Sequence, residues 1–259
     1  MRTLVLPAAL ALAFALYFAL PGVYDALVRL LGALYARLLR LYTGKGSAGV
    51  SALAAYAAVI ILVIAGISSI HPIAAALLIA PLFGALARVS RAAAVKRDLD
   101  GGSHAGDIAA YEALVSDTCA QLAPAFAAEA FLPLLLCALG LALHLGGALG
   151  WAALGLRAVS SKNEHARRIL APLDRAGDRV LHALMLLCAC LVGRNPFRTK
   201  GTDARARLLS VLGIANDATR AHAPMAGDIA QAAFLCCFCL CLLCLALTLV
   251  LLPIIQMTL

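Results

Sequence analysis

Several common catalytic signatures are missing from this sequence. It contains no Ser/His/Asp triad, no HExxH zinc motif and no glycine-rich dinucleotide fingerprint. It also lacks a basic stripe with interleaved aromatic residues, so the net charge of +8 does not indicate a nucleic-acid partner. The basic residues are instead expected to flank membrane spans and to contact anionic head groups.

Strand patterns are also scarce. Alanine and leucine dominate, β-branched residues are few, and no ten-residue segments alternate as they do in a membrane barrel. The chain is 64% hydrophobic, compared with about 45–50% in ordinary globular domains, and its apolar residues gather in long runs. Only helices and closed barrels can span a lipid bilayer, so the spans of this chain should be helices. We therefore predict an all-α integral membrane protein, with one polytopic membrane domain over residues 1–259.

The nine cysteines do not form the pattern of a disulfide framework, because most of them lie inside apolar runs rather than in loops. Cys236, Cys239, Cys241 and Cys244 include two C-x-x-C spacings, which could hold a soft metal on one helix face. Metal binding needs thiolates, however, and these are costly in lipid. We expect these cysteines to act as small apolar packing residues.

The apolar runs predict a bundle of four to six membrane helices. They lie at Leu4–Leu20, Gly49–Ile70, Ile73–Ala87, Phe131–Leu156, Val180–Val192 and Phe234–Ile255. Val23–Tyr42 repeats leucine at helical spacing between arginines, which predicts a basic amphipathic helix at the interface. His71-Pro72 predicts a tight turn between two spans, and we expect Arg88–Glu112 to be a polar connection.

The positive-inside rule creates a conflict in this arrangement. Placing Val23–Lys45 and Arg88–Arg97 in the cytoplasm agrees with the rule. A simple span at Phe131–Leu156 would then put the six basic residues that follow it outside. Either this segment re-enters through its glycines or the orientation is reversed, and the glycines also allow close helix packing.

The most prominent polar segment is an island at Arg157–Arg179 between two apolar runs. Its carboxylates could hold Mg²⁺ while its cations neutralise a phosphorylated or carboxylated ligand. The relevant side chains are Lys162, Asn163, Glu164, Asp174, Arg175 and Asp178. The alternative interpretation is a solvated interhelical loop with helical salt bridges.

Three isolated polar residues also have two interpretations each. Asp117 is either a buried acid or a helix cap or paired charge. Glu129 inside a span would cost roughly 2.5–3.5 kcal/mol, so it is either functional or, as we expect, at the interface. His144 is expected to be a hydrogen-bonded packing residue rather than a ligand.

Three segments in the right order resemble the membrane family of cobalamin-biosynthesis proteins that attach the aminopropanol arm to the corrin ring. The related ampicillin-resistance signalling proteins share the resemblance. The matching residues are His71-Pro72 with Val115–Thr118, then Lys162–Glu164 with Arg175 and Asp178, and finally Asp217-Ala218, Pro224–Gly227 and Ala232-Ala233.

The resemblance implies a multi-pass protein of the bacterial inner membrane. Its reaction would join an activated corrinoid carboxylate to aminopropanol or its phosphate, with ATP and Mg²⁺ and with other pathway membrane proteins as partners. Asp117 and Asp178 would be catalytic. Lys162, Asn163, Glu164, Arg175 and Asp217 would bind the ligand, and no residue is assigned to a metal.

The sequence departs from the family pattern at several polar positions. The segment Pro124–Glu129 lacks the family's Glu-Asn and Ser-Asp-Gly residues, and Ala153–Ala158 lacks its asparagine and aspartate. Met225 and Gly177 replace two further polar residues. We therefore keep two alternatives to the enzyme: a non-catalytic regulatory or interaction protein of the same fold, and a small transporter suggested by the glycines around His144.

Overall fold

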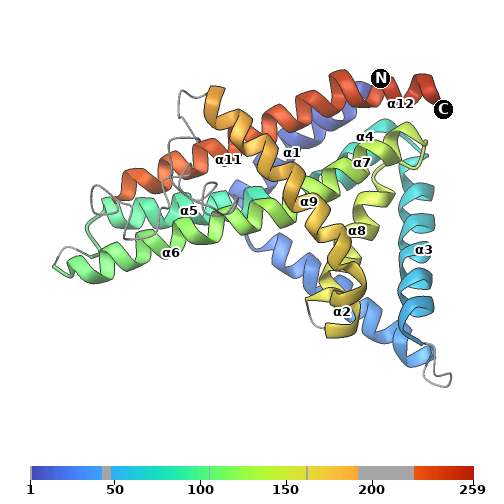
Figure 1. Ribbon diagram of the computed structural model, residues 1–259, viewed down its shortest axis with the longest axis horizontal. Helices are drawn as coiled ribbons and strands as arrows, with labels where there is room; N and C mark the ends of the chain where they lie inside the picture. Colours follow the sequence, from blue (N-terminus) through green and yellow to red (C-terminus); the bar gives the residue numbers. More distant parts are fainter. Residues whose placement is uncertain (1, 43–47, 105, 162, 192–224) are drawn as a thin grey trace.

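The computed structural model describes residues 2–42, 48–104, 106–161, 163–191 and 225–259 (Figure 1). All regular elements among these residues are helices, as the sequence predicted. In chain order they are η1 (Arg2–Leu4), α1 (Val5–Ala19), α2 (Val23–Tyr42), α3 (Ala48–Ser68), α4 (Pro72–Ile79), η2 (Ala80–Leu82), α5 (Ala85–Asp100), α6 (Ile108–Phe126), η3 (Ala127–Phe131), α7 (Leu132–Ala142), α8 (Ala148–Ser160), α9 (Glu164–Leu191), α11 (Ala226–Ala246), η5 (Leu247–Leu251) and α12 (Leu252–Thr258).

Three helical segments within the described ranges are long and apolar enough to cross a membrane: Arg2–Ala19, Gly49–Ser68 and Ala226–Thr258. A fourth is formed by α4, η2 and α5 if this pair, bent by 53°, counts as one broken span. The protein is therefore an all-α membrane protein. Four spans agree with the lower end of the predicted range, and two shorter apolar helices, α7 and α8, accompany them.

Two long helices are each interrupted by a π-helical turn. η3 joins α6 to α7, and η5 joins α11 to α12. Both π turns end just before a proline, Pro133 in α7 and Pro253 in α12. Proline lacks the N–H of the regular helix ladder, and its ring pushes away the carbonyl four residues earlier. For Pro133 that earlier residue is Glu129, which places an acidic side chain inside the irregular turn.

Phe131–Leu156 is not one continuous helix, because α7 and α8 form a tight antiparallel hairpin. Of the two alternatives left by the sequence, this arrangement agrees with a segment that turns back at its glycines. A Cβ on Gly140 would lie 2.5 Å from the Gly146 carbonyl oxygen, and one on Gly150 would lie 2.7 Å from the Pro133 carbonyl oxygen. The turn uses Gly146 at φ 58° and His144 at φ 64°. These glycines let the two backbones approach closely and return the chain to the side from which it came.

The basic amphipathic helix over Val23–Tyr42 is confirmed as α2. It packs against α3 and α8, and the Tyr56 hydroxyl of α3 donates a hydrogen bond of 2.9 Å to the Leu31 carbonyl. Tyr35 and Tyr56 meet edge to face at 5.4 Å between ring centroids. The aromatic face of α2 is therefore anchored in the bundle while its arginines remain outside the core.

Two predicted boundaries were wrong. The segment expected as a polar connection at Arg88–Glu112 contains most of α5 and the start of α6. Most of the polar island belongs to α9, whereas Arg157–Ser160 form the end of α8. α9 continues without interruption into the apolar run up to Leu191 and contains Pro172. Amphipathic periodicity overrides the change in composition, because one helix face can remain polar while another packs against neighbours.

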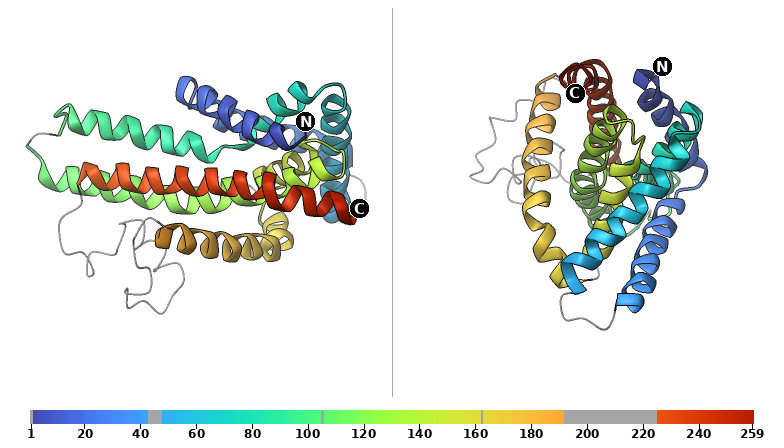
Figure 2. Two further views of the ribbon diagram at one scale, coloured as in Figure 1. Left: turned by 90° about the horizontal axis from the view of Figure 1, so that it is seen from above. Right: turned by 90° about the vertical axis from the view of Figure 1, so that its right-hand side faces the viewer.

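The ends of several helices meet on one side of the bundle (Figures 1 and 2). Arg2 Nη1 lies 3.1 Å from His144 Nε2 in the α7–α8 turn. A Cβ on Gly146 would lie 2.3 Å from the Cβ of Ser68 at the end of α3. Arg2, His144 and Gln256 of α12 line one pocket. We call the region formed by Arg2, Ser68, His144, Gly146 and Gln256 the sparse end, because Arg2 is the only lysine or arginine among these described residues.

Candidate functional site

The break between α4 and α5 organises the polar centre of the molecule. His71 begins α4 by accepting a hydrogen bond of 3.1 Å at Nδ1 from the Ile73 amide, and Pro72 occupies the first turn. Near the other end of α4, the Tyr17 hydroxyl donates to the Pro81 carbonyl at 2.5 Å. The Trp151 indole donates to the Leu78 carbonyl at 2.7 Å. Side chains of α1 and α8 therefore satisfy carbonyls near the break.

Gly84 allows α2 to approach this break. A Cβ at this position would lie 1.9 Å from Cε2 of Tyr24, so any larger residue would overlap the tyrosine ring. Tyr24 is itself buried, and burial raises the pKa of its hydroxyl, with a further contribution from the negative charge of Glu129. Tyr24 therefore stays a neutral phenol. Its neighbour Asp25 is consequently held beside the first turn of α5.

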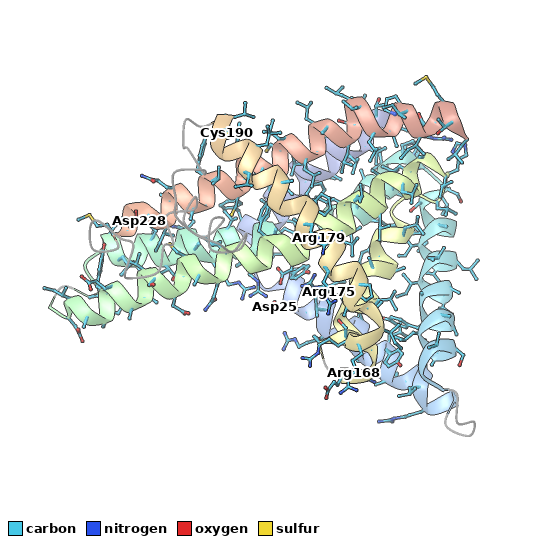
Figure 3. The ribbon with its side chains drawn as sticks, in the orientation of Figure 1. Asp25, Arg168, Arg175, Arg179, Cys190 and Asp228 are labelled. Atoms are coloured by element: carbon cyan, nitrogen blue, oxygen red, sulfur yellow. The ribbon has the colours of Figure 1, made fainter. Side chains whose placement is uncertain are left out.

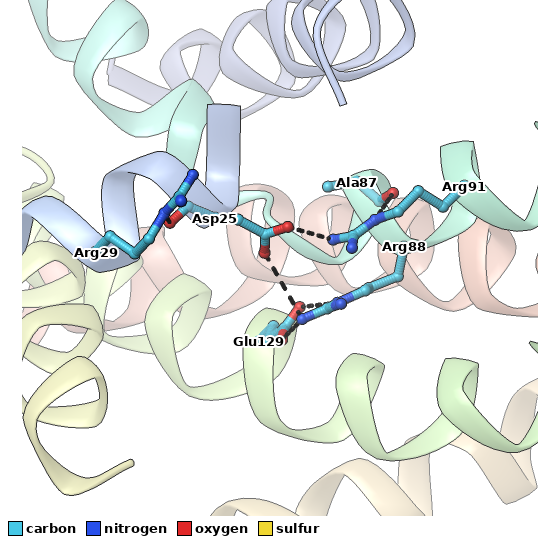
Figure 4. Close-up of polar contacts among 6 residues, drawn as sticks. All are labelled: Asp25, Arg29, Ala87, Arg88, Arg91 and Glu129. Atoms are coloured by element: carbon cyan, nitrogen blue, oxygen red, sulfur yellow. Dashed lines mark hydrogen bonds and ion pairs between the residues drawn. The ribbon is translucent and has the colours of Figure 1, made fainter. Parts of the chain in front are cut away.

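An ionic network joins α2, α5 and the π turn η3 (Figure 4). Arg88 of α5 donates two hydrogen bonds to the Glu129 carboxylate, one of 3.3 Å from Nε to Oε2 and one of 3.1 Å from Nη2 to Oε1. The Asp25 carboxylate lies 3.1 Å from Arg91 Nη2 and 3.9 Å from Arg88 Nη2. We call these four residues the arginine junction.

The members of the arginine junction differ in how far solvent reaches them. The Glu129 side chain is 13% exposed and the Arg88 side chain 31%, whereas the Asp25 and Arg91 side chains are 40% and 42% exposed. Paired Arg88 and Glu129 form the inner part, since a carboxylate this buried requires a fixed partner. The Asp25–Arg91 pair forms an outer part that an incoming group can reach.

The balance of charge around the junction is positive. Arg29 adds a third guanidinium, whose Nε donates to the Asp25 backbone carbonyl at 3.3 Å. The Nη2 atom of Arg91 is shielded from solvent and forms no hydrogen bond of good geometry, despite its ion pair with Asp25. The guanidiniums of Arg88 and Arg91 thus face two carboxylates, and Arg29 adds a further positive charge beside Asp25. An anion that displaces the Asp25 carboxylate would meet this positive charge.

Sequence reasoning singled out only one member of the junction, Glu129. Its partly buried ion pair with Arg88 and its closeness to Tyr17, near the end of α1, fit both the functional and the interfacial interpretation. The other members, Asp25, Arg88 and Arg91, were missed because they belong to no motif and come together only through the fold. A usable signal was Pro133, which follows Glu129 by four residues and marks an irregular turn at an acidic position.

The predicted site residues lie elsewhere. Asp117 is exposed on α6 and accepts a hydrogen bond of 2.8 Å from Gln121. Asn163 precedes α9 and accepts from the Ala166 amide at 3.3 Å, which is a helix cap. Glu164 lies 3.1 Å from Arg168 and 3.8 Å from Arg167. These contacts match the alternative interpretation of caps and helical salt bridges.

The structure describes only some of the remaining predicted residues. Arg175 is exposed on α9 (Figure 3). Asp178 also belongs to α9, but its side chain lies outside the described part of the structure. Lys162 and Asp217 lie outside the described residues altogether. Their assignment to a ligand therefore stays a prediction.

The histidine and the cysteines can also be placed. His144 is exposed and contacts Arg2, so it is hydrogen-bonded as predicted but is not a core residue. Cys236, Cys239 and Cys244 are buried among apolar side chains, whereas Cys241 is exposed. Within the described ranges, no three His, Cys, Asp or Glu side chains gather closely enough to hold a metal ion.

Comparisons with protein-family models, with curated proteins and with solved structures found no match to this chain.

Proposed function

We propose that the arginine junction binds a small anionic group, a phosphate or a carboxylate, at the membrane surface. The observation that carries this proposal is the single Asp25 carboxylate between the guanidiniums of Arg88 and Arg91, at 3.9 and 3.1 Å. A ligand oxygen would take the place of Asp25 and gain charge-assisted hydrogen bonds from both arginines. Glu129 would keep Arg88 in position throughout.

The level of the junction in the bundle supports this role. α1 ends at Ala19, and Asp25 follows within six residues. The junction therefore lies beside the end of a span, where water reaches Asp25 and Arg91, rather than deep in the hydrocarbon region. At such a depth the free-energy cost of charged side chains is small, and a water-soluble ligand can reach them.

The resemblance to cobalamin-biosynthesis membrane proteins suggests a ligand class. Corrinoid precursors with a free carboxylate, and phosphorylated aminopropanol, both present an anionic group of the kind that paired arginines bind. We propose that the chain is a divergent member of this fold in the bacterial inner membrane, with its cation-rich side in the cytoplasm. A regulatory role through ligand binding then agrees with the structural contacts of Asn163 and Glu164.

Amide formation with ATP and Mg²⁺ is the second candidate, favoured by the order of the three sequence segments. Mg²⁺ requires several oxygen ligands, chiefly carboxylates and water. Asp117 and Glu164 are engaged on separate helices, with Gln121 and with Arg168 respectively. Since the described residues do not provide the required set of donors, we assign no catalytic step to ATP or Mg²⁺.

The test is a binding measurement on the purified full chain in detergent. Calorimetry would use inorganic phosphate, ATP and a corrinoid with a free carboxylate as separate probes. Arg91→Gln removes one guanidinium and should weaken binding about tenfold, which corresponds to about 1.4 kcal/mol. Asp25→Asn removes the competing carboxylate and should tighten binding by a similar factor.

The opposite signs of these two effects distinguish a ligand site from a structural ion pair. A purely structural pair would lose stability in both variants and show no tighter binding in Asp25→Asn. The matched control is Lys96→Gln, which removes one cation from an exposed pair with Asp100 on the same helix. Failure of all three probes to bind at millimolar concentration would end the proposal.

A further inference from the structure

The exposed surface of α9 changes its chemistry along the helix. Arg168, Arg175 and Arg179 lie within about 40° of one another around the helix axis, so they share one face. Ala183, Leu187 and Leu191 follow in steps of four residues, each of which advances about 40° around the axis, so the stripe curves away from the arginine face. All six side chains are exposed. Figure 3 shows the three arginines following one another along α9 toward Cys190. The first half of this stripe is basic and the second half is apolar.

The two halves of the stripe require different surroundings. Leu187 is 58% exposed and Leu191 is 63% exposed, so both present a large apolar surface outside the bundle. Eight residues separate Arg179 from Leu187, or about 12 Å along the helix. This distance is enough to pass from the head-group layer of a bilayer into its hydrocarbon core.

The position of α9 in the bundle agrees with such a path. Figure 2 shows α9 along the outside of the molecule, and its contacts include the π turn η3 and the spanning helix α11. The inner side of its second half is anchored by Leu186, which packs against the core. The outward side of this half presents Leu187 and Leu191, and an exposed apolar surface of this kind favours lipid over water.

We propose that the basic stripe of α9, formed by Arg168, Arg175 and Arg179, binds the head groups of anionic phospholipids. The apolar continuation at Leu187 and Leu191 would contact the acyl chains of the same leaflet. This surface is separate from the arginine junction and does not depend on ligand binding there. Its partner is a bilayer with negative surface charge, because three exposed cations on one helix face are followed by exposed apolar residues toward the end of the helix.

The experiment uses the full chain in lipid nanodiscs of two compositions. One contains phosphatidylcholine alone, and the other contains phosphatidylcholine with an equal part of phosphatidylglycerol. Thermal unfolding of the wild-type protein should occur several degrees higher in the anionic discs. High salt should reduce this difference, since exposed charges are screened over about 3 Å at 1 M ionic strength.

The variant Arg175→Gln/Arg179→Gln should lose at least half of the lipid-dependent shift. Its unfolding temperature in pure phosphatidylcholine should match the wild type, because both side chains are exposed. The control Lys96→Gln/Arg97→Gln removes the same charge from α5 and should retain the full shift. Anionic lipid retained by each protein after detergent extraction, counted by native mass spectrometry, gives a second readout.

Three results would overturn this inference. The first is equal stability of the wild type in both lipids. The second is an equal loss of the shift in the α5 control, which would assign the effect to net charge. The third is a full stabilising shift when inorganic phosphate is added to phosphatidylcholine discs. This result would show that the ligand of the stripe is a free anion and not a lipid head group.

Discussion

The sparse end and the arginine junction are both meeting points of several helices, but they are built differently. At the sparse end, the α7–α8 turn touches the start of α1 and the end of α3 through Arg2, Ser68 and small residues. At the junction, α2, α5 and η3 meet through two arginines and two carboxylates. The two regions lie at opposite ends of α1.

The difference indicates how the protein lies in the membrane. Lysine and arginine accumulate on the cytoplasmic side of membrane proteins. The basic helices α2 and α5 meet at the junction, and the basic helix α9 packs against η3, which carries Glu129 of the junction. The sparse end, with Arg2 as its sole lysine or arginine in the described ranges, is expected to face away from the cytoplasm.

The largest expected effect is an all-or-none readout of orientation. A reporter enzyme that is active only outside the cytoplasm should be active when fused after Leu259. The same reporter inserted in the turn at Gly102, between α5 and α6, should be inactive. A fluorescent protein that requires the cytoplasm should give the reverse pattern. Equal activity at both positions would reject the assignment of the two ends to opposite sides.

Gly84→Ala should cause the largest loss of stability. The new Cβ would lie 1.9 Å from the Tyr24 ring, so the loss should reach the upper end of the range for overpacking, about 3 kcal/mol. Thermal unfolding in detergent measures the loss. Gly66→Ala is the matched control, because nothing lies within 4 Å of its Cβ and alanine favours a helix. The double variant Tyr24→Ala/Gly84→Ala should show less than the summed loss, and additive effects would contradict the proposed overlap.

Glu129→Ala should have an intermediate effect. It leaves the Arg88 guanidinium with Asp25 alone, at 3.9 Å. Removing one member of a buried pair costs about 3–5 kcal/mol, and the partial exposure of Arg88 should reduce this to about 2 kcal/mol. Replacing both residues, as Arg88→Met/Glu129→Leu, should restore much of the loss. A double variant less stable than Glu129→Ala would argue that Arg88 has another essential partner.

The smallest effect is expected at the sparse end. His144 has a positive φ of 64°, which asparagine also adopts readily, and an asparagine oxygen can accept from Arg2. His144→Asn should therefore change the free energy of unfolding by about 0.5 kcal/mol or less. Thermal unfolding at pH 7 is the measurement. A loss as large as that of Glu129→Ala would show that polar contacts matter equally at the two ends.

A helix could be predicted from the sequence where one periodic pattern of apolar residues runs along its whole length. α2 shows leucines at helical spacing, and its bounds match the prediction. α9 was divided because its composition changes near Arg179 while its helical phase continues. The arginine junction was not predictable, since Asp25, Arg88 and Glu129 are distant in sequence and the bend at Gly84 brings them together. Asn163 and Glu164 were predicted as ligand groups, although their described contacts are a helix cap and an ion pair with Arg168.

The α7–α8 hairpin determines on which side of the bundle the arginines of α2 and α9 lie. α7 ends at Ala142 near Arg2, and α8 begins at Ala148 and leads back toward the start of α9. Both α2 and α9 pack against α8, so the turn at His144 returns the chain to the side of α2. If α7 and α8 formed one continuous helix, α9 would begin on the far side of the bundle, and its arginines would be separated from those of α2.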